Sequence, residues 1–338
     1  EDNSEKYYPL IVVFVGDYLF EVVAGNVDYY SYWEDMPEAI VVGVNQDDSR
    51  SEDCYVSMVD YLPSKTGAQF YDFIENELLT FMSENYRSLN FRVAIGHGTT
   101  ANFINYFLFK NRPVFNAFVA LSPTLSLEMQ DNLTRRLDLE NEYNTFYYLS
   151  TASLDIKRNH KQIMALNTNI STIENTSLFY GFDNFDKANH YSLVAQSIPK
   201  ALQHIFVIFQ PISKEEYNKH ILTLETSPVD YLIEKYDTIE NLFGIEKQIL
   251  VNDFRAIASA IQKTEQFEYF KDLGKIASKQ HPSTVLANFY MARYYEETGK
   301  PKKAMNIYRS AYTLDEVGGY TKDDMLERAD QLKQEHGL

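Results

Sequence analysis

"FRVAIGHGTTANFINYFLF", residues 91–109, decides the fold of this chain. Residues 91–95 are mostly apolar, a glycine-rich turn follows at 96–100, and apolar residues then continue to 109. A short apolar run that ends in glycine predicts a buried strand, and the longer apolar segment after the turn predicts a helix. A strand joined to a helix by a tight turn is the repeating unit of an α/β domain.

Other apolar runs of similar length are spread over the first two thirds of the chain, at 9–17, 38–44, 117–123, 145–152 and 176–182. Runs that are apolar on both faces are typical of strands buried in a parallel sheet. Helical spacing separates them, most clearly over 67–86, where one face would carry Phe70, Phe73, Ile74, Leu78 and Phe81. We therefore predict an α/β domain with a mostly parallel central sheet over 1–209.

The pattern changes after residue 209. Pro211 and the polar residues around it predict a linker over 210–221, and only helical patterns follow over 222–338. The spacing in 285–316 is that of a tetratricopeptide repeat, carried by Tyr295, Gly299, Ala304, Tyr308 and Ala311. The sequence therefore predicts a small all-α, tetratricopeptide-like second domain. The alternative is an ordinary helical hairpin.

Composition restricts the function. The 338 residues carry a formal net charge of −17, which disfavours nucleic acid or an anionic membrane as the main partner. Cys54 is the sole cysteine, and the histidines lack metal-binding spacing, so we expect no disulfide, metal or cofactor. No apolar run is long enough to span a membrane. The first residues lead directly into a predicted strand, so we expect further residues upstream, an export signal among them.

The turn at 96–100 has the form of a nucleophile elbow with one residue changed. In serine hydrolases this turn reads G-x-S-x-G, whereas here Gly98 occupies the serine position. Such enzymes also need a histidine that follows the last core strand, and His190 lies in a polar loop at that point. We therefore predict His190 as a general base beside Gly98, and a packing role for His97.

Several ordered blocks of residues 7–206 resemble one family of α/β hydrolases. They are YYPLIVVFVGDYLF, MPEAIVVGVNQDDSRSED, the helix and turn of 67–97, FNAFVALSPTL and NHYSLVAQSIPKALQHIF. The family comprises siderophore (enterobactin and salmochelin) esterases and relatives of feruloyl and S-formylglutathione esterases. The resemblance implies an α/β-hydrolase fold, a carboxylic-ester substrate and a bacterial protein of the periplasm or cell surface, with the cytoplasm as the alternative. A tetratricopeptide-like tail also occurs in this family.

The resemblance assigns roles to further residues. Asp155 is the nearest match to the family's catalytic acid, and backbone N–H groups of Thr99 and of Asp17 or Tyr18 match its oxyanion-binding groups. Arg50 and Asp53 match its Arg-x-x-Asp element. These two are therefore substrate-pocket candidates, and Trp33 is a third because it lies in an aromatic-rich stretch.

Glycine at position 98 removes the attacking oxygen, although the turn itself survives because glycine tolerates strained dihedral angles. The chain is then a natural pseudo-esterase, an enzyme whose nucleophile was mutated, or a slow hydrolase in which His190 activates water. The alternative is a ligand-binding or interaction module. It would bind an ester, aromatic or glycan-like ligand in the cleft that holds the active site in the esterases, and a protein partner on the helical tail. Aromatic residues around Tyr18 and Trp33 favour an aromatic-lined pocket, with ordinary packing as the alternative.

Overall fold

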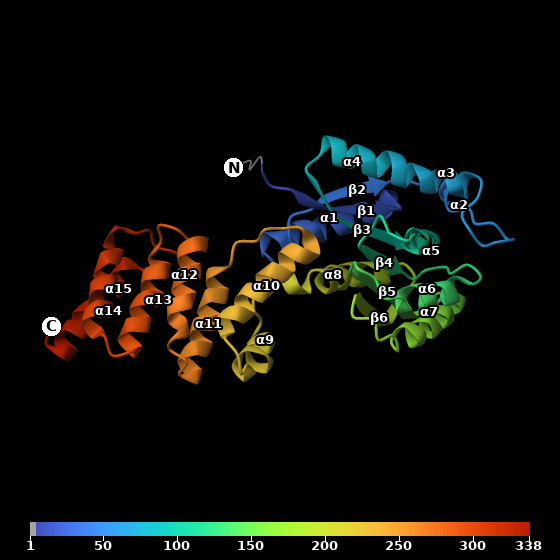
Figure 1. Cartoon of the computed structure of the whole chain (residues 1–338). Helices are drawn as coiled ribbons and strands as arrows, with labels where there is room; N and C mark the ends of the chain where they lie inside the picture. Colours follow the sequence, from blue (N-terminus) through green and yellow to red (C-terminus); the bar gives the residue numbers. More distant parts are fainter. Residues whose placement is uncertain (1–4) are drawn as a thin grey trace. The chain divides into compact units, whose positions relative to one another are not determined.

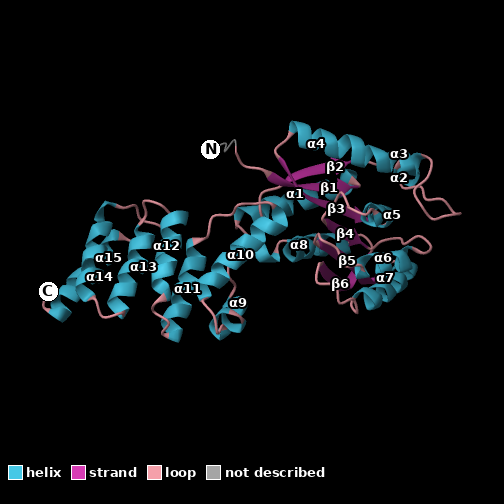
Figure 2. Ribbon diagram, in the orientation of Figure 1, coloured by secondary structure: helices cyan, strands magenta, loops and turns pink. Residues whose placement is uncertain are grey.

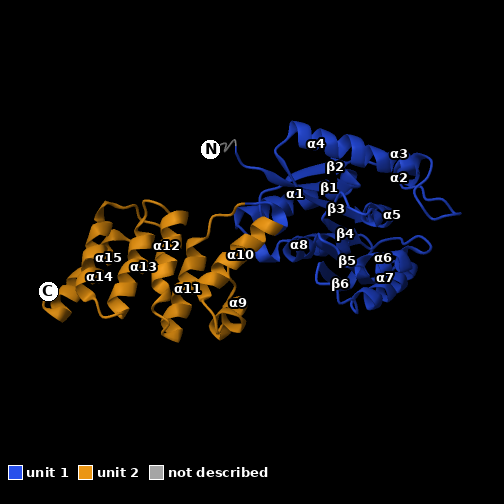
Figure 3. Ribbon diagram, in the orientation of Figure 1, with its two compact units in different colours: residues 1–209, 242–245 blue, residues 210–241, 246–338 orange. Residues whose placement is uncertain are grey.

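The structure is a computed structural model, and it describes residues 5–338. The chain divides into two compact units (Figure 3). The first comprises Glu1–Phe209 together with Leu242–Ile245, and the second comprises Gln210–Asn241 and Glu246–Leu338. Four residues of the predicted helical domain thus belong to the first unit. Among the described residues, no helix is both long and apolar enough to cross a membrane.

The first unit is built on a six-stranded sheet in which all neighbouring strands are parallel (Figures 1 and 2). The strands are β1 (Tyr8–Phe14), β2 (Ile40–Val44), β3 (Ser88–His97), β4 (Ala117–Leu121), β5 (Thr145–Leu154) and β6 (Leu178–Asn189). Their order across the sheet is β2-β1-β3-β4-β5-β6. The six predicted apolar runs are all strands, and the predicted parallel sheet is confirmed.

Helices join each strand to the next, and two more follow the last strand. They are α1 (Gly16–Tyr32), α2 (Arg50–Asp53), α3 (Thr66–Asp72), η1 (Phe73–Leu78), α4 (Leu79–Asn85), α5 (Thr99–Phe103), η2 (Ile104–Phe109), α6 (Met129–Asp138), α7 (Lys157–Ile170), α8 (Leu193–Ile205) and η3 (Val207–Phe209). Helices α3 to α7 share one buried core with Leu10, Val12 and Phe14 of β1. The alternate residues of β1, Ile11 and Val13, point to the other face of the sheet, and α1 and α8 contact each other there.

The helix predicted over 67–86 contains a π-helical turn, η1, between α3 and α4. Phe70 and Ile74 are buried as predicted, but beyond the turn the buried residues are Leu79 and Met82. The wider turn shifts the helix register, and the predicted face member Phe81 is therefore exposed. Phe73 is also partly exposed, so the predicted face is wrong for both phenylalanines.

The second unit is helical. Its helices are α9 (Lys214–Lys219), η4 (Ile221–Thr223), α10 (Pro228–Phe243), α11 (Val251–Thr264), α12 (Tyr269–Gln280), α13 (Val285–Glu297), α14 (Pro301–Ser310), η5 (Ala311–Thr313) and α15 (Lys322–His336). Helix α10 ends in the first unit, where the ring of Phe243 lies against Phe91 and Phe206. Helices α13, α14 and α15 share a core that includes Ala304, Tyr308 and Ala329.

The segment predicted as a linker, 210–221, begins where the second unit begins and is largely helical. Ser213 caps α9 through its hydroxyl, which accepts the N–H of Glu216, and the Glu216 carboxylate accepts the N–H of Ser213 in return. This reciprocal capping box is visible in the sequence as Ser-x-x-Glu. The buried carboxylate of Asp253 also accepts the N–H of Ile212 at 2.8 Å, which ties the segment to α11.

Candidate functional site

The site lies at the carboxyl edge of the sheet, where β3 turns into α5. Gly98 has φ 60° and ψ −113°, a combination that favours glycine. Its N–H donates to Leu121 O, and its carbonyl accepts the N–H of Thr124, both at 2.9 Å. At neighbouring strand ends, Val15 and Ser122 also have positive φ values of 67° and 42°. Strained backbone of this kind clusters at functional sites.

The two glycines of the elbow are required for different reasons. A Cβ atom at Gly96 would lie 2.7 Å from Ala101 N and Thr100 O, so only glycine lets α5 approach the strand. A Cβ atom at Gly98 would meet only His190 within 4 Å, with Nε2 at 3.5 Å and Cε1 at 3.7 Å. The side-chain position at residue 98 is therefore open and faces the His190 imidazole.

We expect Gly96→Ala to lower the free energy of unfolding by about 1–3 kcal/mol, because the added methyl group contacts backbone atoms that cannot move aside. Urea denaturation followed by circular dichroism measures the change. Gly25→Ala is the matched control, since a Cβ atom there has nothing within 4 Å and alanine favours the helix by up to about 1 kcal/mol. Equal stability of Gly96→Ala and the unmodified chain would contradict the packing described here.

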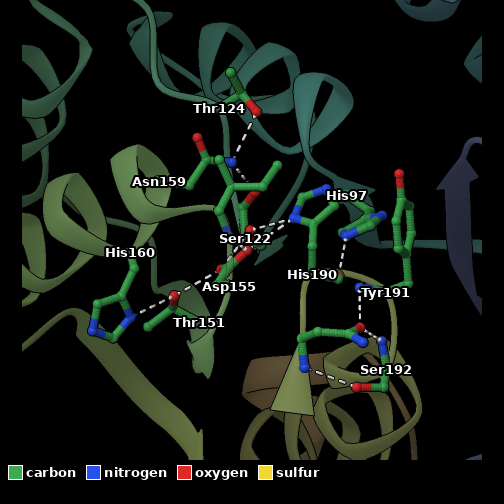
Figure 4. A network of polar contacts seen from close by, with 12 residues as sticks. His97, Ser122, Thr124, Thr151, Asp155, Asn159, His160, His190, Tyr191 and Ser192 are labelled. Carbon is green, nitrogen blue, oxygen red and sulfur yellow. Dashed lines mark hydrogen bonds and ion pairs between the residues drawn. The ribbon is translucent and has the colours of Figure 1, made fainter.

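His190 is held by a buried carboxylate (Figure 4). Its Nδ1 lies 3.0 Å from Asp155 Oδ1 and 2.9 Å from Ser122 Oγ. The Ser122 hydroxyl donates to Asp155 Oδ2 at 2.7 Å, so its oxygen can accept from Nδ1 only if Nδ1 carries the proton. The Nε2 atom of neutral His190 therefore keeps its lone pair, and it is the atom that faces Gly98.

The Asp155 side chain is completely buried yet fully paired. Besides His190 and Ser122, it accepts the Thr151 hydroxyl at 2.8 Å and the N–H of Ile156 at 2.7 Å. Burial alone would raise the pKa of this carboxyl, but the four hydrogen bonds outweigh burial and lower the pKa below its usual value. Asp155 is therefore an anion at neutral pH, able to stabilise a protonated His190.

His97 supports His190 from the other side. Its Nε2 lies 2.9 Å from the backbone carbonyl of His190, and its Nδ1 lies 2.6 Å from the hydroxyl of Tyr18. A carbonyl can only accept, so Nε2 carries the proton and Nδ1 accepts from Tyr18. Burial, with the adjacent His190, lowers the pKa of His97 to about 4. His97 is therefore neutral and fixes the backbone of the His190 loop, in line with its predicted packing role.

The low pKa of His97 makes stability depend on pH. Between pH 6.5 and about 4 the unfolded chain binds a proton on His97 that the folded chain does not, so stability falls as the pH falls through this range. The loss is on the order of 3 kcal/mol. We expect His97→Gln, which keeps a donor for the His190 carbonyl, to show a smaller loss in urea denaturation at pH 7 and pH 4.5. The same loss in both proteins would contradict this assignment.

The predicted oxyanion groups occupy two helix starts. Thr99 is the first residue of α5, and Asp17 lies in the first turn of α1, where N–H groups have no acceptor within the helix. The N–H of Tyr18 instead lies 3.3 Å from Val15 O. The hydroxyl of Thr100 is buried and bonded to the backbone of His97, so it cannot replace the missing serine.

The three substrate-pocket candidates differ in how close they lie to the site. Arg50 forms an ion pair with Asp17 at 2.7 Å, and its guanidinium lies 5.4 Å from the centre of the Tyr18 ring, so it borders the site. The Asp53 carboxylate is occupied by Ser49 and Gln46. Trp33 follows the far end of the 17-residue helix α1, about 25 Å from its start, so the structure does not bring Trp33 to the site.

Sequence reasoning missed the hydroxyl groups around Asp155. These groups belong to Ser122 and Thr151, which lie in the apolar runs 117–123 and 145–152. Both side chains are buried and donate to the carboxylate. Their positions at the ends of β4 and β5 were the available signal, since the carboxyl ends of parallel strands meet at one edge. Within residues 5–338, no group of three or more His, Cys, Asp or Glu side chains is arranged to hold a metal ion.

No protein-family model and no curated protein matches this sequence. Several solved structures are similar to this chain. An uncharacterised protein from Capnocytophaga ochracea has a TM-score of 0.87 at 29% identity, over 99% of this chain and 93% of that chain. An IroE-like serine hydrolase from Shewanella oneidensis has a TM-score of 0.58 at 16% identity, over 80% and 89%. A siderophore hydrolase, EstA, from Aspergillus nidulans has a TM-score of 0.51 at 14% identity, over 62% and 86%.

The two hydrolases establish the fold. The first unit has the α/β-hydrolase fold, as the family resemblance implied. At identities of 16% and 14% the likeness concerns the arrangement of the chain, so the chemistry of this site must be argued from its own residues.

Proposed function

We propose that this protein is a pseudo-esterase, which binds an ester or a related carbonyl ligand in an α/β-hydrolase cleft without forming an acyl-enzyme. One observation carries the proposal: a Cβ atom at Gly98 would lie 3.5 Å from His190 Nε2. A serine hydroxyl on that carbon would reach Nε2 at about 2.7 Å, an ordinary hydrogen-bond length. The site thus has the geometry of a nucleophile and its base, with only the nucleophile's atoms missing.

In this proposal each neighbouring residue keeps its esterase role. His190 is the base, and Asp155 orients it and stabilises its charged form. The N–H groups of Thr99 and Asp17 bind the carbonyl oxygen of the ligand. Arg50, paired with Asp17 and close to the Tyr18 ring, borders the ligand. Without an attacking oxygen at residue 98, these groups bind and polarise an ester but do not cleave it efficiently.

For the second unit we propose two tetratricopeptide-like repeats that serve a protein partner. Helices α11 and α13 begin at residues 251 and 285, which are 34 residues apart, the period of this repeat. The expected small and aromatic positions Ala304, Tyr308 and Ala311 are buried, and Gly299 has the positive φ of 74° that its turn requires. These observations favour the repeat over an ordinary hairpin.

Titration with phenyl acetate tests the ligand proposal. We expect a saturable shift of the His190 imidazole NMR signals, while phenol release stays at or below the residual level of a triad enzyme without its serine, about 10³–10⁴-fold over water. Trp33→Phe is the control, since Trp33 lies far along α1 from the site and its replacement should leave binding unchanged. Phenol release well above that residual level that is lost in His190→Ala, or no saturable binding at millimolar ester, would refute the proposal.

A further inference from the structure

The Asp155 carboxylate is held at both of its oxygens. Oδ1 lies 3.0 Å from His190 Nδ1 and accepts the N–H of Ile156 at 2.7 Å. Oδ2 accepts two hydroxyls, that of Ser122 at 2.7 Å and that of Thr151 at 2.8 Å. These hydroxyls come from neighbouring parts of the sheet, since Ser122 directly follows β4 and Thr151 lies in β5. Each carboxylate oxygen therefore has two donors.

The two hydroxyls are arranged alike, because each also lies beside the Nδ1 atom of a histidine (Figure 4). Ser122 Oγ is 2.9 Å from His190 Nδ1. Thr151 Oγ1 is 3.2 Å from the Nδ1 atom of a second histidine, His160, which lies half-buried in the first turn of α7. Asp155 is thus linked to two imidazoles, to His190 directly and to His160 through the Thr151 hydroxyl.

The donor roles in this chain of contacts fix the proton on His160. A hydroxyl has one hydrogen, and Thr151 gives it to the Asp155 carboxylate, which is the stronger acceptor of its two neighbours. The Thr151 oxygen then presents a lone pair to His160 Nδ1, so this contact is attractive only if Nδ1 carries the proton. Neutral His160 is therefore held with its hydrogen on Nδ1 and its lone pair on Nε2, the same tautomer as His190.

We propose that His160 is a positioning residue for His190. By donating to Thr151 Oγ1, His160 keeps the threonine hydroxyl directed at the carboxylate and polarises it, which strengthens the next hydrogen bond. The Asp155 carboxylate then holds the Nδ1 proton of His190 in place, and the Nε2 atom stays directed toward Gly98. That this orientation serves an ester ligand rests on the proposed function, whereas the contacts themselves need no ligand.

The tautomers can be read from long-range ¹H–¹⁵N NMR spectra of the unliganded chain at pH 8. We expect the proton on Nδ1 in His160 and His190, and on Nε2 in His97, which donates to a backbone carbonyl. The exposed His336 is the reference for a solvated imidazole in the same spectrum. A His160 signal pattern like that of His336, or a proton on His160 Nε2, would overturn the proposal.

Thr151→Val tests the link between the two imidazoles, since valine has the shape of threonine without its hydroxyl. We expect His160 to lose its fixed Nδ1 proton, and the Nδ1 proton of His190 to exchange with water roughly tenfold faster, because a hydrogen bond to a charged group is lost. Thr151→Ser keeps the hydroxyl and should restore both properties. Thr134→Val is the matched control, because the Thr134 hydroxyl donates to the Gln130 carbonyl within α6.

His160→Phe tests the histidine itself, because phenylalanine keeps an aromatic ring but has no donor. The His190 Nδ1 proton should exchange about two- to fourfold faster, a smaller effect because His160 only strengthens a bond that Thr151 still makes. An unchanged rate in this variant would remove the role of His160, even if Thr151→Val is effective. An unchanged rate in folded Thr151→Val would break the link itself. If Thr151→Val does not fold, the tautomers and His160→Phe decide.

These measurements are independent of the proposed function, because none of them uses an ester. If the tautomers and exchange rates are as expected but phenyl acetate does not bind, the positioning of His190 stands and the pseudo-esterase is wrong. If phenyl acetate binds but His160→Phe leaves the His190 proton unchanged, the pseudo-esterase stands and the role of His160 is wrong.

Discussion

Replacing Gly98 by serine should convert this protein into an esterase, with a rise in phenyl acetate hydrolysis of at least about 10³-fold. The loss of a triad serine costs up to about 10⁶-fold in an evolved enzyme, so even partial alignment gives a large gain. The new hydroxyl would lie within hydrogen-bond reach of His190 Nε2, and nothing else obstructs its Cβ atom. Phenol release, followed by absorbance, measures the effect.

The serine variant carries a cost in stability and needs two controls. A non-glycine residue at φ 60° and ψ −113° is strained by about 1–3 kcal/mol, so its folding should be checked by thermal denaturation. Gly98→Ser/His190→Ala should lose the gained activity, because the serine then has no base. A gain that survives in the double variant would mean that the hydrolysis comes from another site.

In the Gly98→Ser background, Asp155→Asn should lower kcat by about 10²–10⁴-fold. Asparagine keeps the size of the side chain but removes the negative charge, and its amide can force His190 into the wrong tautomer. The buried carboxylate has four hydrogen-bond donors that hold it in place, so its orientation toward His190 is rigid. Stopped-flow or steady-state kinetics with phenyl acetate gives kcat.

Asp183→Asn in the same background is the matched control. Asp183 also lies on the sheet and accepts a tyrosine hydroxyl, that of Tyr148 at 2.7 Å, but it has no contact with His190. We expect its kcat to stay within about twofold of the single variant, as for residues outside the reacting groups. An Asp155→Asn variant as active as Asp183→Asn would show that Asp155 does not act on His190.

The sequence was sufficient to predict the sheet and the core of the site. Six apolar runs predicted six strands, because strands of a parallel sheet are buried on both faces and read as continuous apolar segments. Chain order predicted that His190 would approach Gly98, and the family resemblance indicated Asp155, after the predicted strand 145–152, as the acid. In the structure these three residues lie together.

Other features required three-dimensional information. The π-helical turn η1 changes which residues of 67–86 are buried, and no local composition marks it. Trp33 was grouped with Tyr18 because both belong to one aromatic-rich stretch, but a helix of 17 residues separates them. The Tyr18 side chain binds His97 across 79 positions of sequence, a contact that exists only because the fold brings the start of α1 to the end of β3. The capping box of Ser213 and Glu216, by contrast, was visible in the sequence and was overlooked.

Covalent labelling of Gly98→Ser by diisopropyl fluorophosphate tests the central claim most directly, namely that residue 98 occupies the position of a nucleophile activated by His190. Intact-mass spectrometry followed by peptide mapping should find one phosphoryl adduct, on residue 98. The unmodified chain, which has no hydroxyl there, and Gly98→Ser/His190→Ala should remain unlabelled. A correctly folded Gly98→Ser variant that takes no adduct, or takes it equally well without His190, would contradict the account.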